Sequence, residues 1–471
     1  MSSAFVSPGQ ESQAVGMGRA EALDRAIKHI KADQFRAAAR ICHGVLAADP
    51  GNASALHTLG IAMQKQGRAG LGIELVKEAI LRDGSNVHFH LSLCEMCRLE
   101  KRLDEALLHG QRSLALKPGD AMAHRLLGLA RFERGELDES IRHLRAAIAL
   151  APRHAGSHCA LAEALLLRGD MTEGFAEYEW RHQLENVPLL LSPRPPQPLW
   201  EGQPLPPGAL LLVADQGFGD VIHFSRYIPM VADRSPGFAI VSDPEVEPIL
   251  RQQPGVDRII VAPHQLPDFS SWSPLSTLPR IFGTTLATIP APIPYIRATP
   301  EKIRRWGERI AAGVPPGYLR VGMVWAGRPA HGNDRSRSAT LKVFAPLGAL
   351  DRVALVSLQM GAPQTQLDSY AGRAPLIDLG REITDFGDTA GILENIDLVI
   401  AVDTSIVHLA GAMGRPVWAL LPSAPDWRWM LNREDSPWYP SVVLLRQPAA
   451  GRWDTLLEST AKRLEAMLPG A

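Results

Sequence analysis

AMAHRLLGLARFERGELDESIRHLRAAIALAP, residues 121–152, predicts two helices joined by a turn at Gly135. Glycine suits such a turn because it tolerates a positive φ. Pro152 ends the second helix, since proline cannot continue it, and Pro118 stands 34 residues earlier. Pro50 stands twice that distance before Pro118. The helical pair therefore recurs with a period of 34 residues.

Tetratricopeptide repeats have this period and this pair of helices. Five copies are predicted, and they begin near Arg19, Ala53, Val87, Ala121 and Ala155. The eighth residue of each copy is small, which lets its two helices approach closely: Ala26, Gly60, Cys94, Gly128 and Ala162. Glycine recurs at the turn, with Asp33 and Lys101 as departures. We expect a disordered segment over 1–18 and then a solenoid over 19–186, which is a binding surface rather than a catalyst.

The composition narrows the classes of function. The chain has 471 residues, which indicates about three folding units. Lys and Arg together number 49 and Asp and Glu 50, and this balance argues against a general nucleic-acid binder. The polar start MSSAFVSPGQESQ lacks a signal-peptide pattern, and no apolar run reaches the ~20 residues of a membrane span. We therefore expect a cytoplasmic protein.

All four cysteines lie in the repeats. Cys94 and Cys97 form one C-x-x-C with no second pair, so a four-thiolate zinc site has no support. Both also fall on packing positions of the repeat. We favour structural packing over metal or redox chemistry, and we expect no metal.

A proline-rich linker is predicted over residues 187–207. Eight prolines fall within 188–207, too many for a helix, and all ten tryptophans lie at Trp180 or later. Beyond the linker, helices alternate with strands predicted at 208–215, 237–243, 257–262, 320–327, 353–359, 397–403 and 416–422. This alternation indicates two Rossmann-like α/β domains, 208–299 and 300–471, with ligands bound in the cleft at the carboxyl ends of their strands. The expected fold class is thus α plus α/β.

The first candidate site is DQGFGD, residues 215–220, where a strand meets a helix predicted over 219–231 that Pro229 should kink or shorten. Gly217 and Gly219 allow a tight turn and close approach by a ligand. Asp220 opens the helix. It is either an N-cap or a general base at the cleft, and the sequence alone favours the cap.

The second candidate site is AVDTSIVHLAGAMGRP, residues 401–416. Thr404 and Ser405 begin a helix after a strand, and free N–H groups with two hydroxyls at a helix start form an anion site. His408 lies one turn further and could reach the same phosphate. The alternative is that Asp403 caps the helix and His408 is a packed core histidine, which the sequence alone favours.

Two more segments carry candidate residues. WAGRPAHGNDRSRS, residues 325–338, offers Arg328, His331, Arg335 and Arg337 to a leaving diphosphate, or it is a solvated loop. APDWRWMLNREDSPWYP, residues 424–440, crowds aromatic residues that either cap the domain core or stack on a ligand, and we favour the cap.

With these motifs in view, the chain resembles bacterial tetratricopeptide-repeat glycosyltransferases whose C-terminal half is similar to heptosyltransferases, glycosyltransferase family 9. The resemblance covers nearly the whole chain and rests on YEWR, PQPLW, DQGFGDVIHFSRYIP, FGTTLATIPAPIPY, VWAGRPAHGNDRSRS, VDTSIVHLAGAMGRPVW and LLPSAPDWRWMLNREDSPWYP. It implies a GT-B fold of two Rossmann-like domains, the acceptor side first and the nucleotide-sugar side second.

The resemblance also implies roles for single residues. Asp220 matches the catalytic base of the family. The residues implied on the donor side are Gly327, Arg335, Arg337, Gln359, Asp403, Thr404, Ser405 and His408. Those implied on the acceptor side are Gln216, Gly217, Gly219 and His223. The donor-side lysine of heptosyltransferases has no counterpart here, and Arg335 or Arg337 would substitute for it.

The resemblance predicts a metal-independent, inverting glycosyltransferase without a cofactor. It would move a sugar from a nucleotide-sugar to Ser or Thr of a protein held by the repeats, with flagellin as a plausible acceptor. Two alternatives remain. The acceptor could be a lipopolysaccharide or another glycan, or the chain could be a non-catalytic scaffold with a degenerate transferase half.

Overall fold

The computed structural model describes residues 18–184, 194–261, 265–329 and 332–468. The expected disordered segment at residues 1–17 and the linker residues 187–193 lie outside these ranges. The chain divides into two compact units, Met1–Ala164 and Leu165–Ala471. The predicted end of the solenoid at residue 186 differs from this division, because the last helix of the predicted repeats lies in the second unit.

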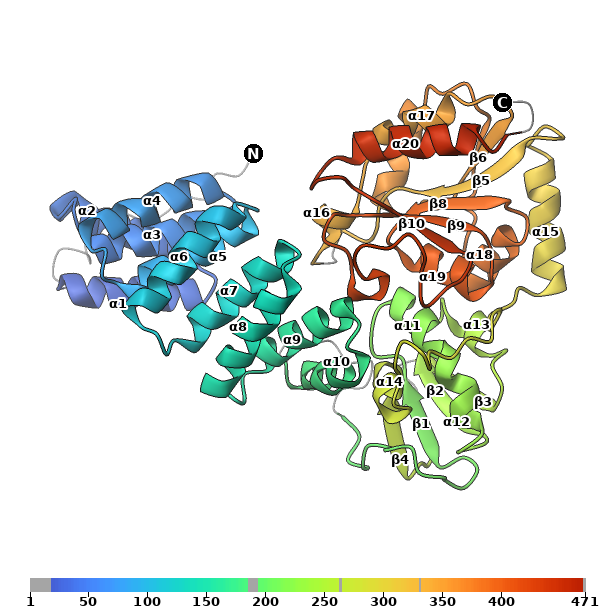
Figure 1. The fold of residues 1–471 in the computed structure, drawn as a ribbon, viewed down its shortest axis with the longest axis horizontal. Coiled ribbons are helices and arrows are strands. Elements are labelled where there is room, and N and C mark those ends of the chain that lie inside the picture. Colours follow the sequence, from blue (N-terminus) through green and yellow to red (C-terminus); the bar gives the residue numbers. More distant parts are fainter. Residues whose placement is uncertain (1–17, 185–193, 262–264, 330–331, 469–471) are drawn as a thin grey trace, which may run out of the picture. The chain divides into compact units, whose positions relative to one another are not determined.

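The first unit is a stack of helical pairs (Figure 1). Its helices are α1 (Arg19–Lys31), α2 (Phe35–Ala48), α3 (Ala53–Lys65), α4 (Ala69–Arg82), α5 (Val87–Leu99), α6 (Leu103–Leu116), α7 (Ala121–Glu133) and α8 (Leu137–Leu150). Helix α9 (Ala155–Arg168) continues into the second unit. The first helix of each pair begins at a residue that the period predicts, so the repeat register is confirmed.

The turn between paired helices requires a left-handed residue. Gly67 and Gly135 have φ values of 80° and 79°. Asp33 and Lys101, which replace glycine at this position, have φ values of 56° and 60°. Asp33 and Lys101 therefore adopt the same left-handed backbone conformation as the glycines. For a residue with a Cβ this conformation lowers stability by about 1–2 kcal/mol.

Small residues bring the paired helices together as predicted. A Cβ added to Gly60 would lie 2.7 Å from Val76 Cγ2, and one added to Gly128 would lie 2.7 Å from Leu144 Cγ. Cys94 and Cys97 are fully buried free thiols. Burial raises the pKa of Cys94 to about 12 and that of Cys97 to about 11, which suits inert packing residues.

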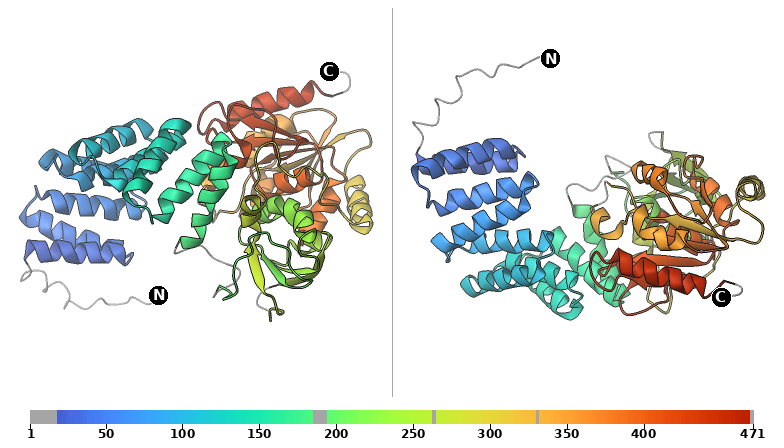
Figure 2. Two further views of the ribbon diagram at one scale, coloured as in Figure 1. Left: turned by 60° about the horizontal axis from the view of Figure 1, so that its bottom comes forward. Right: turned by 90° about the horizontal axis from the view of Figure 1, so that it is seen from above.

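The second unit contains two parallel sheets covered by helices (Figure 2). Its helices are α10 (Met171–Tyr178), α11 (Phe218–Phe224), α12 (Ile228–Ala232), α13 (Glu247–Leu250), α14 (Leu278–Ile281), α15 (Pro300–Ala311), α16 (Asp334–Arg337), α17 (Ala345–Gly348), α18 (Phe386–Leu393), α19 (Ser405–Ala412) and α20 (Trp453–Glu465). The described part of the chain has no helix that is both long and apolar enough to cross a membrane.

The smaller sheet has the strand order β3-β2-β1-β4, and the larger has the order β10-β9-β8-β5-β6-β7. The strands of the smaller sheet are β1 (Leu210–Val213), β2 (Phe238–Ser242), β3 (Val256–Val261) and β4 (Ser271–Pro274). Those of the larger are β5 (Leu319–Val324), β6 (Val353–Ser357), β7 (Leu376–Asp378), β8 (Leu398–Val402), β9 (Val417–Leu421) and β10 (Val442–Arg446). All neighbouring strands are parallel.

The larger sheet has the six-strand order of doubly wound α/β domains, and the smaller has the first four strands of that order. The order reverses between β1 and β4 in one sheet and between β5 and β8 in the other. Ligands of such sheets bind at the carboxyl ends of the strands where the order reverses. The segments that follow β1, β5 and β8 are therefore the places for a site.

Some elements differ from those predicted. β4, β7 and β10 were not expected, and β4 is only Ser-Trp-Ser-Pro, although all four residues are buried. The helix predicted over 219–231 is divided into α11, a 3-10 turn at Ser225–Tyr227 and α12, with Pro229 in the first turn of α12. The segment 244–252 between β2 and β3 forms only the short helix α13. Prolines in both segments explain the shortening, because each lacks an N–H for the helix interior.

Candidate functional site

The start of α11 contacts the start of α19. A Cβ added to Gly219 in α11 would lie 2.9 Å from His408 Cδ2 and 3.6 Å from Ser405 Cα. Helix α11 follows β1 and α19 follows β8, so both helices begin at strands where the sheet order reverses. The first two candidate segments of the sequence, 215–220 and 401–416, are therefore brought together.

Asp220 lies in the first turn of α11 and is not its N-cap, which is Gly217. The capping interpretation favoured by the sequence is therefore wrong. The Asp220 side chain is 26 % exposed, and its Oδ1 accepts a hydrogen bond from Arg428 Nη2. Gln216 is half-buried and Gly217 exposed immediately before the helix. Asp220 thus presents a partly accessible carboxylate at the helix start.

Arg428 is a site residue that the sequence analysis did not identify. Its side chain is 5 % exposed. Its Nη1 donates to Asp426 Oδ1 at 3.0 Å, and its Nη2 donates to Asp220 Oδ1. Its Cζ lies 4.2 Å from the centre of the Trp427 ring. Burial lowers the pKa of Arg428, but Asp426 and Asp220 outweigh it and hold the pKa above the usual value. The signal was present only as an arginine between two tryptophans, WRW.

A tyrosine joins the two histidines of the site. Tyr439 Oη lies 3.0 Å from Nδ1 of His408 and 3.0 Å from Nδ1 of His223. His223 is fully buried, so this residue predicted on the acceptor side contacts protein rather than an open surface. His408 is 6 % exposed and stacks on Trp429 with ring centres 5.2 Å apart. Burial, followed by the charge of Arg428, holds the pKa of both imidazoles well below the usual range, so both are neutral.

Asp403 is buried beside His408. Its Oδ1 lies 4.0 Å from His408 Nε2. Burial and the Asp426 carboxylate raise the pKa of Asp403 to about 7 against the opposing charges of Arg337 and Arg428. Its carboxyl is therefore divided between protonated and ionised forms near neutral pH.

Thr404 is the N-cap of α19, and Ser405 is the first residue of that helix. The Thr404 side chain makes no capping hydrogen bond. Its Oγ1 is buried and has no hydrogen-bond partner among the residues that the structure describes. A hydroxyl and the N–H groups of a helix start thus lie together, as an anion site requires.

The remaining residues predicted on the donor side follow β5 and β6. A Cβ at Gly327 would lie 2.7 Å from Arg337 Nη2, so the guanidinium rests on this glycine. Arg335 is exposed on α16, and His331 lies outside the described residues. Gln359 is 3 % exposed, and its amide is occupied by main chain: Oε1 accepts from the N–H groups of Trp325 and Ala326, and Nε2 donates to two carbonyls. Its side chain ties the end of β5 to the end of β6.

Buried polar contacts of Arg181, the last residue of the YEWR motif, attach this motif to the smaller sheet. We call these contacts the buried joint. Arg181 is 5 % exposed, and its Nη2 donates to Thr277 Oγ1 at 2.9 Å and to Ser276 Oγ. Its Nε lies 3.7 Å from Asp215 Oδ2 at the end of β1. Burial raises the pKa of Asp215, and Arg181 opposes the rise. This ion pair is structural and leaves Asp220 as the carboxylate accessible at the turn.

The aromatic residues of 424–440 are buried, in agreement with the predicted capping role. Trp427, Trp429, Trp438 and Tyr439 are at most 4 % exposed. The Phe175 ring of α10 packs edge-on against Trp427 with centres 5.6 Å apart. The last helix of the repeats therefore packs directly on the segment that carries Arg428.

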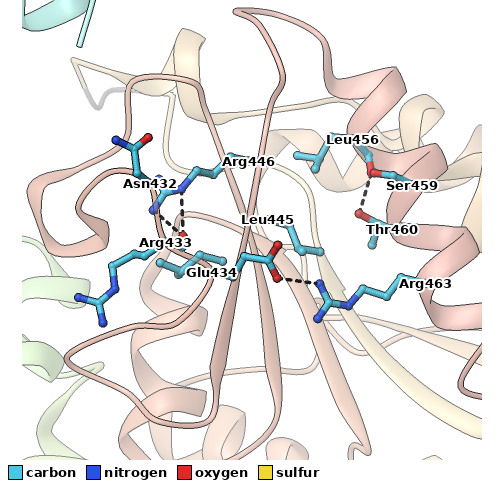
Figure 3. Close-up of a pocket in the computed structure, with 10 residues that line it drawn as sticks. Asn432, Arg433, Glu434, Leu445, Arg446, Leu456, Ser459, Thr460 and Arg463 are labelled. Atoms are coloured by element: carbon cyan, nitrogen blue, oxygen red, sulfur yellow. Dashed lines mark hydrogen bonds and ion pairs between the residues drawn. The ribbon is translucent and has the colours of Figure 1, made fainter. Parts of the chain in front are cut away.

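A hollow of about 610 Å³ lies elsewhere, between β10 and α20 (Figure 3). It is lined by Asn432, Arg433, Glu434, Leu444, Leu445, Arg446, Leu456, Ser459, Thr460 and Arg463. Glu434 and Arg463 form an ion pair at 3.5 Å, as Figure 3 shows. The hollow contains none of the residues that the sequence predicts for the site.

The comparisons with known proteins match the repeats and, for one relative, a longer part of the chain. The tetratricopeptide repeat family matches residues 57–121 and 125–179. Protein FlbA of Caulobacter vibrioides is 24% identical over 321 residues, which are 62% of this chain and 52% of FlbA. The chain thus spans about half the length of this curated relative.

Two solved structures are similar to about a third of the chain. The crystal structure of MamA is 24% identical and covers 34% of this chain and 92% of its own, with a TM-score of 0.31. A thermophilic tetratricopeptide-repeat protein of Thermus thermophilus is 22% identical and covers 36% of this chain and 92% of its own, with a TM-score of 0.33. The matched residues show that the chain carries tetratricopeptide repeats.

Proposed function

We propose that the second unit is a glycosyltransferase of GT-B architecture, metal-independent and inverting, that glycosylates Ser or Thr of a protein. One observation carries this proposal. The starts of α11 and α19 are in contact, with a Cβ at Gly219 only 3.6 Å from Ser405 Cα. This contact brings the partly exposed Asp220 carboxylate near the helix start that would bind the phosphate.

The two sheets support the GT-B part of the proposal. Each has the strand order of a doubly wound domain, and the candidate residues follow the strands where the order reverses. Asp220 lies on α11, which follows strand β1 of the smaller sheet. Thr404 and His408 lie at the start of α19, which follows strand β8 of the larger sheet. A donor bound at the start of α19 would thus lie next to an acceptor hydroxyl that Asp220 of α11 deprotonates.

The chemistry requires a base and a group that stabilises the leaving phosphate. Asp220 would take the proton of the acceptor hydroxyl as its oxygen attacks the anomeric carbon and the bond to the phosphate oxygen breaks. The N–H groups at the start of α19, the Thr404 hydroxyl and the Arg337 guanidinium would stabilise the charge on the leaving nucleotide. Arg428 would hold Asp220 in place, since it binds that carboxylate and is itself buried.

The repeats would hold the acceptor polypeptide, because solenoids of this kind present extended binding surfaces. Flagellin is the proposed acceptor on the basis of the family resemblance, and a cytoplasmic reaction is proposed with it. Within the second unit, α10, the last helix of the predicted repeats, contacts Trp427 next to Arg428.

The test is sugar transfer by the full-length Asp220→Asn protein. A thermal-shift screen of nucleotide-sugars first identifies the donor, since a ligand at 100 times its Kd adds about 2.7 kcal/mol to stability. We expect Asp220→Asn to keep the donor-induced shift and to lose transfer by roughly 10²–10⁴-fold. Asp233→Asn, an exposed aspartate in the same part of the chain, is the matched control and should transfer normally.

Three results would count against the proposal. Transfer at the wild-type rate by Asp220→Asn would remove Asp220 as the base. A failure of every nucleotide-sugar to raise the Tm would favour a non-catalytic scaffold. Efficient transfer to a free glycan with none to a protein would favour a glycan acceptor.

A further inference from the structure

The contacts of Tyr439 limit where the protons of two histidines can lie. Its Oη is 3.0 Å from Nδ1 of both His408 and His223, and Tyr439 is fully buried. Nearby Arg226 is also fully buried and donates to the His223 carbonyl at 3.1 Å and the Trp438 carbonyl at 3.1 Å. These contacts hold the three rings in a fixed arrangement.

Each of the three rings carries one proton on a polar atom. Both imidazoles are neutral because burial and adjacent arginines disfavour their charged forms, and burial keeps the Tyr439 phenol neutral too. A phenol oxygen has one proton, so Tyr439 can donate to only one of the two Nδ1 atoms. When Tyr439 donates to one Nδ1, the other imidazole donates from its own Nδ1 to the Tyr439 oxygen. Tyr295 is a further hydrogen-bond partner of Tyr439, and if the Tyr439 proton goes to Tyr295, both imidazoles donate from Nδ1.

The surroundings of the two Nε2 atoms decide among these arrangements. His223 Nε2 is buried, and no described residue offers it a hydrogen-bond partner. A proton there would be an unsatisfied buried donor, which proteins avoid more strictly than an unsatisfied acceptor. His408 Nε2 instead faces the Asp403 carboxyl, with Oδ1 4.0 Å away. The ionised form of the Asp403 carboxyl favours a proton on His408 Nε2.

We propose that Tyr439 donates to His408 Nδ1 and accepts from His223 Nδ1, which fixes His408 as its Nε2–H tautomer. Tyr439 and His223 are then positioning residues for His408. This role rests on the proposed function, whereas the tautomer itself stands on the hydrogen bonds alone.

The tautomer matters because Nε2 is the nitrogen at the contact of the two helix starts. It lies 3.6 Å from the position of a Cβ on Gly219. An N–H at this place can donate to an oxygen of a leaving phosphate. The other tautomer would present a lone pair to that oxygen and would repel it.

The experiment is nitrogen-15 nuclear magnetic resonance of full-length protein labelled in histidine, without a donor present. Long-range proton–nitrogen correlations distinguish a protonated ring nitrogen from an unprotonated one, and signals missing from a His408→Asn protein assign the ring. We expect protonated Nε2 and unprotonated Nδ1 in His408, with the reverse in His223. A proton on His408 Nδ1 would overturn the inference whatever the enzyme does.

Two variants test the role of the tyrosine. Tyr439→Phe should give averaged signals for the two His408 nitrogens and lower the kcat of transfer by at least about tenfold. Tyr370→Phe removes a hydroxyl that donates to the Ala374 carbonyl at 2.8 Å, outside the site, and should change neither. If Tyr439→Phe keeps the wild-type His408 signals, Tyr439 does not fix the tautomer.

The outcomes separate this inference from the proposed function. The expected tautomer together with normal transfer by Asp220→Asn would leave the tautomer standing and remove the proposed base. The expected tautomer together with an unchanged kcat in Tyr439→Phe would overturn the positioning role alone.

Discussion

Gly219 leaves no room for a side chain next to His408. A Cβ at this position would lie 2.9 Å from His408 Cδ2, well inside a normal carbon–carbon contact. The glycine is therefore a steric requirement for the contact between α11 and α19, and not only for the turn that precedes the helix. The two halves of the proposed site can meet at this distance only because position 219 lacks a side chain.

Gly219→Ala should separate the two helix starts. We expect a loss of stability of about 1–3 kcal/mol, as for overpacking in a core, and a loss of transfer of up to about 10²-fold from misplaced groups. Urea unfolding and transfer assays measure the two effects. Gly44→Ala, where an added Cβ meets nothing within 4 Å, should cause neither loss. Normal transfer by Gly219→Ala would show that the close contact is dispensable.

Asp403→Asn should make stability less dependent on pH. The pKa of Asp403 rises from its usual 3.8 to about 7 on folding, so the folded state binds the proton more tightly. This contribution to stability is present below about pH 4 and is lost as pH rises through about 7. The variant should match the wild type near pH 4 and be more stable at pH 8, as urea unfolding at both pH values would show. Asp233→Asn serves as the exposed control, and a constant difference between variant and wild type at both pH values would contradict the prediction.

Arg181→Ala should destabilise the second unit strongly. It leaves the Asp215 carboxyl buried without the guanidinium 3.7 Å away, and breaking a buried pair costs about 3–5 kcal/mol. Arg251→Ala removes an exposed pair with Glu247 and should cost less than about 1 kcal/mol. Chemical unfolding followed by tryptophan fluorescence reports on this unit, because every tryptophan lies at Trp180 or later. Equal effects of the two variants would mean that the joint contributes little.

The repeats should lose stability in acid because of paired histidines. His90 and His109 approach with their Nδ1 atoms 3.0 Å apart, and one repeat later His124 and His143 approach to 3.1 Å. Burial lowers the pKa of His109 and of His143 from 6.5 to about 4. A histidine with a lowered pKa in the folded state contributes to the free energy of unfolding above pH 6.5, and this contribution is lost as pH falls through about 4.

Hydrogen exchange, corrected for the intrinsic rate and followed by mass spectrometry in peptides from α5–α8, would localise this loss. His109→Gln should reduce the pH dependence, since glutamine does not titrate. His43→Gln replaces an exposed histidine and should leave it unchanged. Protection that stays constant between pH 6.5 and pH 4 in the wild type would contradict the prediction.

The starts of the repeats were predictable because the contacts within a repeat are local. The turn between paired helices has a positive φ, which Gly67 and Gly135 adopt readily. The same contacts recur every 34 residues. Several strands were predictable for a similar reason, since Leu210–Val213 and Leu398–Val402 are uninterrupted apolar runs. β4 escaped prediction because Ser-Trp-Ser-Pro carries no such pattern, and only its place beside β1 buries it.

The sequence alone determined the repeats, the alternation of strands and helices, and the residue types at the two turns that carry Asp220 and Thr404. Only the tertiary structure decided which groups meet them: Arg428 reaches Asp220 across 208 residues of sequence, and Tyr439 reaches His223 across 216. Local patterns encode elements because neighbouring residues share hydrogen bonds and faces. The partners of a buried charge or ring depend on how whole sheets pack, and no short stretch of sequence contains that information.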